Sequence, residues 1–316
     1  MVMRIPVIVL FAPTATGKTA LALKLFGRGS LSFFKNKVEL ISADSMQVYK
    51  GLDIGTAKPD QIEKDELKHH LIDLYEADTQ FTVADFVEKA DELCKKIYSE
   101  GKIPLIAGGT GFYIRNFILG LPDTPVSDEK IRNQIKERLL QEGKEKLYQE
   151  LQKIDPESAE KINVNDEYRI CRALEVYYAS GKPRSSFKVN KQARDLYDFH
   201  VIILERSREE LYQRINQRVD SMFDQGLEQE VSSLYSKGCR KNMPGMMAIG
   251  YREWFDEEGN LRKDTDKIRE EIKRDSRKYA KKQYTFMADI PSAVKIDASD
   301  PDKTFTSVEA LIKSLF

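Results

Sequence analysis

The chain has 316 residues, with 51 basic and 51 acidic side chains and therefore no net charge at pH 7. Charged residues make up 32% of it and hydrophobic residues 41%, with a mean hydropathy of −0.51, which is typical of a soluble globular protein of one large or two modest domains. No apolar run approaches the roughly 20 residues that cross a bilayer, which excludes a membrane-spanning protein. Three scattered cysteines and three histidines favour neither a disulfide framework nor a structural zinc site, so we expect a cytoplasmic protein.

The first predicted strand, residues 5–11, leads through a loop into a helix-like run at 20–26. The loop matches the P-loop pattern except for alanine in place of the first glycine, and it reads Ala12, Pro13, Thr14, Ala15, Thr16, Gly17, Lys18 and Thr19. In such a loop the amides and the helix N-terminus bind phosphate, Lys18 adds positive charge, and the Thr19 hydroxyl is a ligand for phosphate-bound Mg²⁺. Because alanine tolerates positive φ poorly, Ala12 predicts a slightly altered start of the loop. The alternative is a chance Gly-Lys-Thr with Thr16 as a helix cap, but the strand–loop–helix setting favours phosphate binding.

Further strand-like runs at 38–42 and 103–107 alternate with helix-like runs, notably 83–98. Such alternation predicts an α/β fold, with a mostly parallel, P-loop NTPase-like sheet that carries helices on both faces. Each predicted strand ends in a functional-looking loop, the second at 43–47 and the third at 108–111. Because ligands of open α/β sheets lie beyond the carboxyl ends of the strands, we expect the three loops to converge.

Asp44 lies in the loop just beyond the second predicted strand. By itself such a carboxylate is typical of a Walker B-like group that holds Mg²⁺ through water in an ATPase or kinase. Its neighbours Ser45 and Gln47 add hydroxyl and amide groups, which suit recognition of a base edge and removal of a proton from an exocyclic amine.

The segment 122–197 is charged and helical in pattern, with helices predicted at 128–142, 144–153, 156–162 and 166–180. We therefore predict an all-helical insertion domain at 122–197 within an α/β core domain formed by 1–121 and 198–316. After the insertion we predict a returning strand at 199–204, an edge strand at 291–296, and helices at 208–223, 228–236, 245–255, 266–287 and 307–315.

The helix predicted at 266–287 carries a row of basic residues, Arg269, Lys273, Arg277 and Lys281, with Arg274, Lys278 and Lys282 one position on. Steps of four place side chains on neighbouring turns, so this row predicts a broad cationic stripe. Charge runs are usually solvated helix faces, but here only Asp275 follows Glu271, which favours contact with RNA phosphates. A second basic cluster adds to it, made of Lys182, Arg184, Lys188, Lys191 and Arg194.

Seven sequence blocks, spread over nearly the whole chain, match the motifs of one protein family and occur in the same order. They are 44–59, His69-His70-Leu71-Ile72-Asp73, 108–113, Asn165-Asp166 with Arg169 and 172–176, Arg214-Ile215 with Arg218, 248–253, and Tyr279-Ala280-Lys281-Lys282-Gln283. With the P-loop before them, they resemble the tRNA dimethylallyltransferases, or tRNA isopentenyltransferases, of the bacterial type without a zinc finger. These enzymes prenylate N6 of the adenosine beside the anticodon.

The resemblance implies transfer of a dimethylallyl group from dimethylallyl diphosphate to N6 of the adenosine 3′-adjacent to the anticodon of tRNA, with release of diphosphate. The P-loop with Lys18, Thr19 with Mg²⁺, and Arg218 would neutralise the leaving diphosphate. Asp44 would hydrogen-bond the adenine amine and accept its proton, and Thr110 would donate a hydrogen bond at the bridging oxygen or the amine.

Residue matching further implies contacts with the tRNA anticodon stem-loop from Asp44, Ser45, Met46, Gln47, Thr110, Arg132, Tyr168, Arg169, Ile170, Cys171, Arg172, Met247, Ala248, Ile249, Gly250, Tyr251 and Arg252, and the basic helix adds Arg277 and Lys281. Met246 and Met247 depart from the polar residues usual before Ala-Ile-Gly-Tyr, and Phe286 replaces the usual tryptophan. We expect a monomer without membrane attachment.

Three other functions fit parts of the pattern. An adenylate isopentenyltransferase that acts on free AMP, ADP or ATP shares the P-loop chemistry but needs neither the insertion nor the basic helix. A P-loop kinase or NTPase that binds RNA would need a base-reading pocket and a nucleotide-triggered switch, and the sequence shows neither. A non-catalytic RNA-binding module leaves Lys18, Thr19 and Asp44 unexplained.

Overall fold

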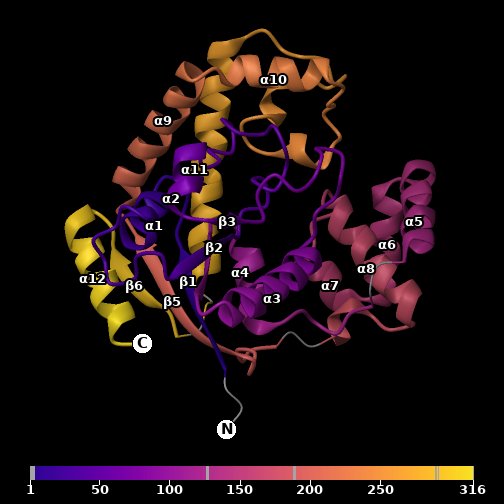
Figure 1. The fold of residues 1–316 in the computed structure, drawn as a ribbon. Helices are drawn as coiled ribbons and strands as arrows, with labels where there is room; N and C mark the ends of the chain where they lie inside the picture. The colour runs from indigo at the N-terminus through magenta and orange to yellow at the C-terminus, as the bar shows by residue number, and fades with distance from the viewer. Residues whose placement is uncertain (1–3, 126–127, 188–189, 289, 291, 316) are drawn as a thin grey trace. The chain divides into compact units, whose positions relative to one another are not determined.

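Six strands form one sheet in the computed structural model, which describes residues 4–125, 128–187, 190–288, 290 and 292–315 (Figure 1). Their order is β3-β2-β4-β1-β5-β6, and every neighbouring pair is parallel. The strands are β1 (Ile5–Phe11), β2 (Val38–Ser42), β3 (His69–His70), β4 (Ile103–Gly108), β5 (Tyr197–Glu205) and β6 (Val294–Asp297). The predicted α/β class and parallel sheet are confirmed, while β3 was not predicted because two residues carry no recognisable period.

Helices cover both faces of this sheet. On one face, α1 (Lys18–Phe26) and α12 (Pro301–Lys313) share an apolar core with Leu10 of β1. On the other, α3 (Val83–Ser99) precedes β4 and α4 (Gly111–Leu119) follows it, and the ring of Phe117 contacts Tyr197 and Phe199 of β5. Because both faces are covered, the central strands β1 and β4 are buried along nearly their whole length and read as continuous apolar runs.

The remaining helices of the sheet unit are α2 (Gln61–Glu66), α9 (Arg208–Asp224), α10 (Leu227–Ser236) and α11 (Thr265–Ala288). The two longest of these helices, α9 and α11, pack side by side (Figure 1). Asp300 caps α12 by accepting hydrogen bonds from the amides of Asp302 and Lys303, so this helix begins six residues before the predicted 307. Helices α2 and α4 were not predicted.

The helix predicted at 245–255 is wrong. The segment forms two short 3₁₀ turns, η2 (Pro244–Met247) and η3 (Arg252–Trp254). Gly250 lies between them with a φ of 101°, which an α-helix does not accommodate. Its carbonyl accepts a hydrogen bond from Trp254 Nε1 and its amide donates to Glu253, so tertiary contacts replace the helical pattern.

A second compact unit comprises Gly120–Gln192, and the sheet unit comprises Met1–Leu119 and Ala193–Phe316. The described residues of the second unit form helices only: α5 (Glu129–Glu142), α6 (Lys144–Ile154), α7 (Pro156–Lys161), α8 (Glu167–Ser180) and the 3₁₀ turn η1 (Arg184–Ser186). Its core includes Ile135, Leu147 and Leu174. This unit starts at Gly120, before the predicted 122, and ends at Gln192, before the predicted 197. Tyr197 itself belongs to β5 of the sheet unit.

A buried carboxylate ties β2 to its neighbours. Glu39, 2% exposed, contacts His70 Nε2 at 2.7 Å, Lys102 Nζ at 2.6 Å and Lys68 Nζ at 3.1 Å. Burial opposes ionisation, but hydrogen bonds from Lys102, His70 and Lys68 outweigh it and lower the pKa of Glu39 to about 2.

We expect Glu39→Gln to lower the free energy of unfolding by on the order of 3 kcal/mol at neutral pH. Because the folded pKa is depressed, this stabilisation is complete above the ordinary glutamate pKa of 4.5 and is lost as the pH falls toward about 2. Urea unfolding at a series of pH values checks this, with Glu88→Gln on the exposed side of α3 as the control. A difference that did not shrink in acid would contradict it.

Candidate active site

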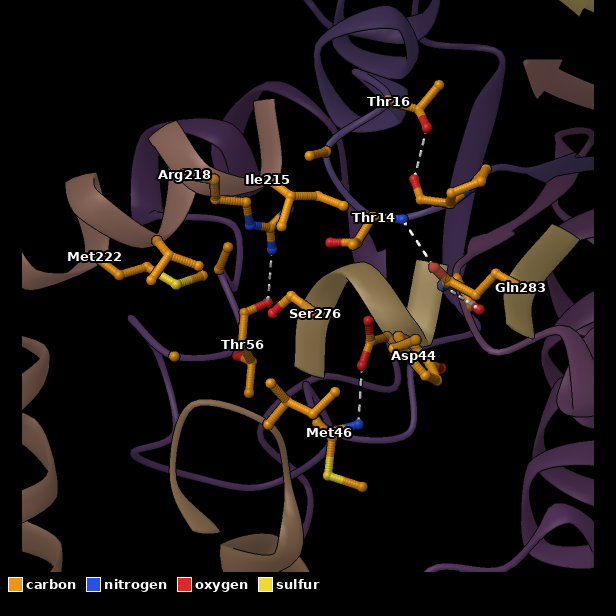
Figure 2. Close-up of a pocket in the computed structure, with 18 of the residues that line it drawn as sticks. Thr14, Thr16, Asp44, Met46, Thr56, Ile215, Arg218, Met222, Ser276 and Gln283 are labelled. Atoms are coloured by element: carbon orange, nitrogen blue, oxygen red, sulfur yellow. Dashed lines mark hydrogen bonds between the residues drawn. The ribbon is translucent and has the colours of Figure 1, made fainter. Parts of the chain in front are cut away.

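A cavity of about 660 Å³ lies beyond the carboxyl ends of β1, β2 and β4 (Figure 2). The whole predicted P-loop lines it, as do the loops after β2 and β4, so the three loops converge as predicted. Its other walls come from the segments 55–57 and 247–252 and from α9 and α11; the lining includes Asp44, Ser45, Met46, Gln47, Thr56, Gly109, Arg214, Ile215, Arg218, Met222, Met247, Ala248, Ile249, Arg252, Ile272, Ser276, Tyr279 and Gln283.

The P-loop departs from the expectation for its first position. Positive φ occurs at Ala15 (62°) and Gly17 (103°), while Ala12 packs in the core beneath α1. The alteration expected from the Cβ of Ala12 is therefore not found, because the position needs no positive φ. Thr16, the alternative helix cap considered from the sequence, does not cap α1. Its hydroxyl donates to the carbonyl of Pro13 at 2.8 Å, and Gly17 is the N-cap, with no side chain to satisfy the first helical amides.

Three side chains from distant elements hold this loop. Arg214 Nε donates to the carbonyl of Ala15 at 2.8 Å, and Arg206 Nε donates to that of Thr16 at 2.9 Å. Gln283 accepts from the Thr14 amide at 3.0 Å and donates to the carbonyl of Gly109 at 2.6 Å, which joins the P-loop to the loop after β4. We did not predict roles for Arg206, Arg214 or Gln283, although two of them lie within the motif blocks.

Two partly buried cations lie at the phosphate end of the cavity. The pKa of Lys18 is lowered, chiefly by burial. The negative charge of Asp44 acts in the opposite direction, and the positive charge of Arg218 adds to the lowering. Burial also lowers the pKa of the Arg218 guanidinium, against the attraction of Asp44. Arg218 Nη2 donates to the carbonyl of Thr56 at 3.4 Å (Figure 2). Cations that burial penalises in this way gain most from a multiply charged anion between them.

An apolar wall lies beside Arg218, on the same helix, α9. Ile215, Val219 and Met222 of α9 line the cavity and are buried, and Arg214 and Arg218 of the same helix line it as well. Figure 2 shows Ile215, Arg218 and Met222 of this wall. The cavity thus offers positive charge and hydrocarbon surface side by side. Sequence reasoning missed this wall, since an apolar stripe on a helix is usually core.

Asp44 and Thr110 are placed by backbone contacts. Asp44 Oδ1 accepts from the amides of Met46 at 2.9 Å and Gln47 at 3.4 Å, which orients the carboxylate (Figure 2). Thr110 Oγ1 accepts from the Ser45 amide at 3.0 Å and is hydrogen-bonded to the hydroxyl of Tyr279. Burial, with the charge of Asp44, raises the pKa of Tyr279 to about 12, so this phenol stays neutral near Asp44.

The segment 247–252 contributes Met247, Ala248, Ile249 and Arg252 to the cavity. Tyr251 is fully buried, with its hydroxyl 2.6 Å from Glu230, so its side chain supports the wall and does not meet a ligand directly. Met246 is likewise a core residue, and only its neighbour Met247 is exposed.

In the helical unit, the predicted tRNA residues lie on α5 and α8. Tyr168 and Arg169 are exposed, and Arg132 and Arg172 are 4.0 and 3.1 Å from Glu175. Two predictions need correction there: the side chains of Ile170 and Cys171 are buried in the core of the unit and cannot contact RNA.

The predicted cationic stripe is only partly correct. Arg269 and Lys273 contact Asp220 of α9 at 3.9 and 2.7 Å, and Arg277 donates to Asn216 at 2.5 Å. This half of the row packs on α9, whereas the exposed basic residues of the row are Arg274, Lys278, Lys281 and Lys282. In the second cluster, Arg194 pairs with Asp91 at 2.8 Å, and Lys188 lies outside the described residues.

Residues 47–289 match the sequence profile of the IPP transferase family. The chain belongs to this family. It is 40% identical over 314 residues to the tRNA dimethylallyltransferase of Acetivibrio thermocellus, covering 98% of this chain and 96% of that protein. It is also 40% identical to that of Geobacillus thermodenitrificans, with coverages of 97% and 95%. The resemblance seen in the sequence is confirmed, and the chain is an isoprenoid-transferring enzyme.

Solved structures agree with this family assignment. The full-length tRNA isopentenylpyrophosphate transferase from Bacillus halodurans superposes with a TM-score of 0.67 at 35% identity, covering 98% of this chain and 96% of that one. A eukaryotic dimethylallyltransferase acting on tRNA gives a TM-score of 0.78 at 27% identity, with coverages of 97% and 77%. Among the described residues of this IPP transferase family member, no helix is both long and apolar enough to cross a membrane.

Proposed function

We propose that the protein transfers a dimethylallyl group from dimethylallyl diphosphate to N6 of the adenosine 3′-adjacent to the anticodon of tRNA and releases diphosphate. One observation carries this proposal above the others. A single cavity joins the partly buried cations Lys18 and Arg218, the apolar wall around Ile215, and the carboxylate of Asp44. These are the surfaces that a prenyl diphosphate and an amine acceptor require.

The diphosphate binds at the P-loop. The first amides of α1, Lys18 and Arg218 bind its oxygens, and the dimethylallyl chain lies against the apolar wall of α9. As the allylic carbon–oxygen bond breaks, negative charge grows on the diphosphate, and preformed donors stabilise that charge without reorganising. Arg214, held on the Ala15 carbonyl, adds a further cation at the same end.

The acceptor amine binds at Asp44. Its nitrogen forms a bond to the allylic carbon as the bond to the diphosphate oxygen breaks, and the proton lost from N6 passes to the Asp44 carboxylate. The two amides that bind Oδ1 keep the carboxylate from rotating. Thr110 does not line the cavity itself, but its Oγ1 accepts from the amide of Ser45, beside Asp44, and would orient the amine or the bridging oxygen. Holding both reactants in line supplies much of the rate enhancement.

Mg²⁺ fits this cavity only as a partner of the substrate. Among the residues that the structure describes, no three His, Cys, Asp or Glu side chains come together to hold a metal. The Thr19 hydroxyl lines the cavity and would hold the ion together with diphosphate oxygens and water, the coordination that Mg²⁺ prefers. When bound, the ion adds positive charge on the leaving diphosphate.

The anticodon stem-loop is the proposed macromolecular substrate. The target adenine has to leave its stack to reach Asp44, as bases do in other enzymes that modify them. Met247, Ile249 and Arg252 line the cavity and would contact the extruded base or its neighbours. Tyr168, Arg169, Arg132 and Arg172 are proposed phosphate or base contacts of the helical unit, and we propose a cytoplasmic monomer.

A direct test uses labelled dimethylallyl diphosphate with Mg²⁺ and one of two acceptors, a tRNA anticodon stem-loop or AMP. Label in the stem-loop is the expected result. Label in AMP alone would instead support an adenylate isopentenyltransferase, and turnover of ATP without prenyl transfer would support a P-loop NTPase.

Lys281→Ala is expected to weaken stem-loop binding and to lower the slope of log affinity against log salt by about 1, because one phosphate contact and its counterion release are lost. Lys281 is exposed on α11, on the part of the basic row that does not pack on α9. Lys303→Ala on α12, where the side chain is 85% exposed, is the matched control. An unchanged salt slope for Lys281→Ala would argue against RNA contact there.

A further inference from the structure

A carboxylate outside the cavity binds the backbone of one cavity wall. Glu230 of α10 accepts hydrogen bonds from three successive amides, those of Asp53 at 3.2 Å, Ile54 at 2.8 Å and Gly55 at 3.2 Å. It also accepts from the hydroxyl of Tyr251 at 2.6 Å. A carboxylate can bind these four donors because both of its oxygens only accept hydrogen bonds. A glutamine in its place would direct its NH₂ group, itself a donor, toward some of them.

The same contact joins two walls of the cavity. Tyr251 belongs to the segment 247–252, and its hydroxyl also accepts from the Gly55 amide at 3.1 Å. The packing between them leaves no room, since a Cβ on Gly55 would lie 2.5 Å from the Tyr251 ring. Lys58 fixes the other side of the segment 53–57, with Nζ at 2.6 Å from both Asp53 and Asp73.

The segment that Glu230 binds ends in carbonyls that contact cavity residues. The Thr56 carbonyl accepts from Arg218 Nη2 at 3.4 Å, and the Ala57 carbonyl accepts from Gln47 Nε2 at 3.2 Å. Arg218 and Gln47 both line the cavity, whereas Glu230 does not. A chain of hydrogen bonds thus leads from α10 through one backbone segment to the cation at the phosphate end.

We propose that Glu230 is a positioning residue for prenyl transfer, which acts by holding the Thr56 carbonyl where it directs the Arg218 guanidinium at the diphosphate. The inference rests on the proposed function, because it assigns the diphosphate to Arg218. Glu230 touches no reacting atom. Its loss lets the 53–57 segment and Arg218 shift, and a displacement of about 1 Å at such a site costs up to about 100-fold in rate.

The test compares Glu230→Gln with Glu228→Gln, which removes an exposed carboxylate from the same helix. For Glu230→Gln we expect kcat to fall about 10- to 100-fold and the KM for dimethylallyl diphosphate to rise about tenfold. The Kd for the stem-loop should stay within about twofold, and Glu228→Gln should match the wild type. A uniform loss of stem-loop binding and prenyl diphosphate binding in the folded variant would indicate general damage and overturn the proposal.

Tyr251→Phe keeps the test informative if Glu230→Gln does not fold, because it removes one donor and preserves the packed ring. We expect its KM for dimethylallyl diphosphate to rise about threefold, and a wild-type KM would overturn the proposal. A double variant with Arg218→Gln separates direct from indirect action. If Glu230 acts through Arg218, the double variant is about as slow as Arg218→Gln alone, whereas multiplicative losses contradict the mechanism.

Failure of the proposed function is recognised separately, with the wild-type protein. If the wild type labels AMP and not the stem-loop, the acceptor is wrong, and the same variants measured with AMP still test Glu230 through the KM for dimethylallyl diphosphate. If the wild type transfers no prenyl group to either acceptor, the proposal for Glu230 falls with the function.

Discussion

Asp44→Asn lowers kcat for prenyl transfer by about 1,000-fold and leaves the affinity for dimethylallyl diphosphate within about threefold of the wild type. The asparagine has the same shape and can still accept from the amides of Met46 and Gln47, so the loop keeps its conformation. What is lost is the group that accepts the proton from N6 as the new bond forms. The loss therefore appears in the chemical step and not in binding of the diphosphate.

Single-turnover rates with the stem-loop, together with equilibrium binding of dimethylallyl diphosphate, measure the two quantities separately. Asp65→Asn is the matched control, since Asp65 is an exposed carboxylate on α2. An Asp44→Asn protein with more than about a tenth of the wild-type single-turnover rate would exclude Asp44 as the proton acceptor.

Lys18→Met lowers kcat/KM for dimethylallyl diphosphate by about 100- to 1,000-fold, because it removes a preformed cation from the leaving diphosphate. The same change should not lower the stability of the ligand-free protein. Burial lowers the pKa of Lys18, so its charged form is held at a cost in the free protein, and a methionine of similar length relieves that cost. We therefore expect a midpoint of thermal unfolding equal to or above that of the wild type.

Lys24→Met is the control on the same helix, since Lys24 pairs with Asp302 at the surface. It should leave kcat/KM unchanged. Dimethylallyl diphosphate should raise the unfolding midpoint of the wild type and of Lys24→Met, but not that of Lys18→Met at the same concentration. Equal stabilisation of Lys18→Met by the ligand would show that the diphosphate binds elsewhere.

The lowered pKa of Lys18 also predicts how the affinity for dimethylallyl diphosphate depends on pH. Its pKa in the ligand-free protein lies below the ordinary lysine value of 10.5, and a bound anion raises it. Binding therefore takes up a proton, and the affinity for the diphosphate falls as the pH rises from the lowered pKa of the ligand-free protein toward the higher pKa of the complex. Lys18→Met should lose this dependence.

The local sequence was enough to predict a structural feature wherever that feature depends on residues that are neighbours in the chain. The strands at 5–11 and 38–42 and the phosphate loop between strand and helix are such cases, because backbone geometry and a few adjacent residues decide them. The same holds for the four helices of the second unit, whose apolar residues recur with a helical period.

Periodicity alone failed where it had to distinguish exposed from packed faces. The row Arg269, Lys273 and Arg277 has a spacing that fits a solvent-facing stripe equally well, but α9 supplies Asp220 and Asn216 against it. Ile170 and Tyr251 were predicted as tRNA contacts from matched motifs, yet both side chains are buried. A motif identifies residues that a family needs without saying which of them touch the ligand.

By itself the sequence determined the parallel sheet, the helical character of the second unit, the phosphate loop and the family, since each depends on residues close together in the chain or on ordered motifs. Only the tertiary structure decided how the cavity is built. Arg206, Arg214 and Gln283 reach the P-loop from about 190 to 270 positions away in the chain, and Glu230 reaches residues 53–55 from about 175 positions away. Such contacts depend on where helices dock on the sheet, a property that no local pattern encodes.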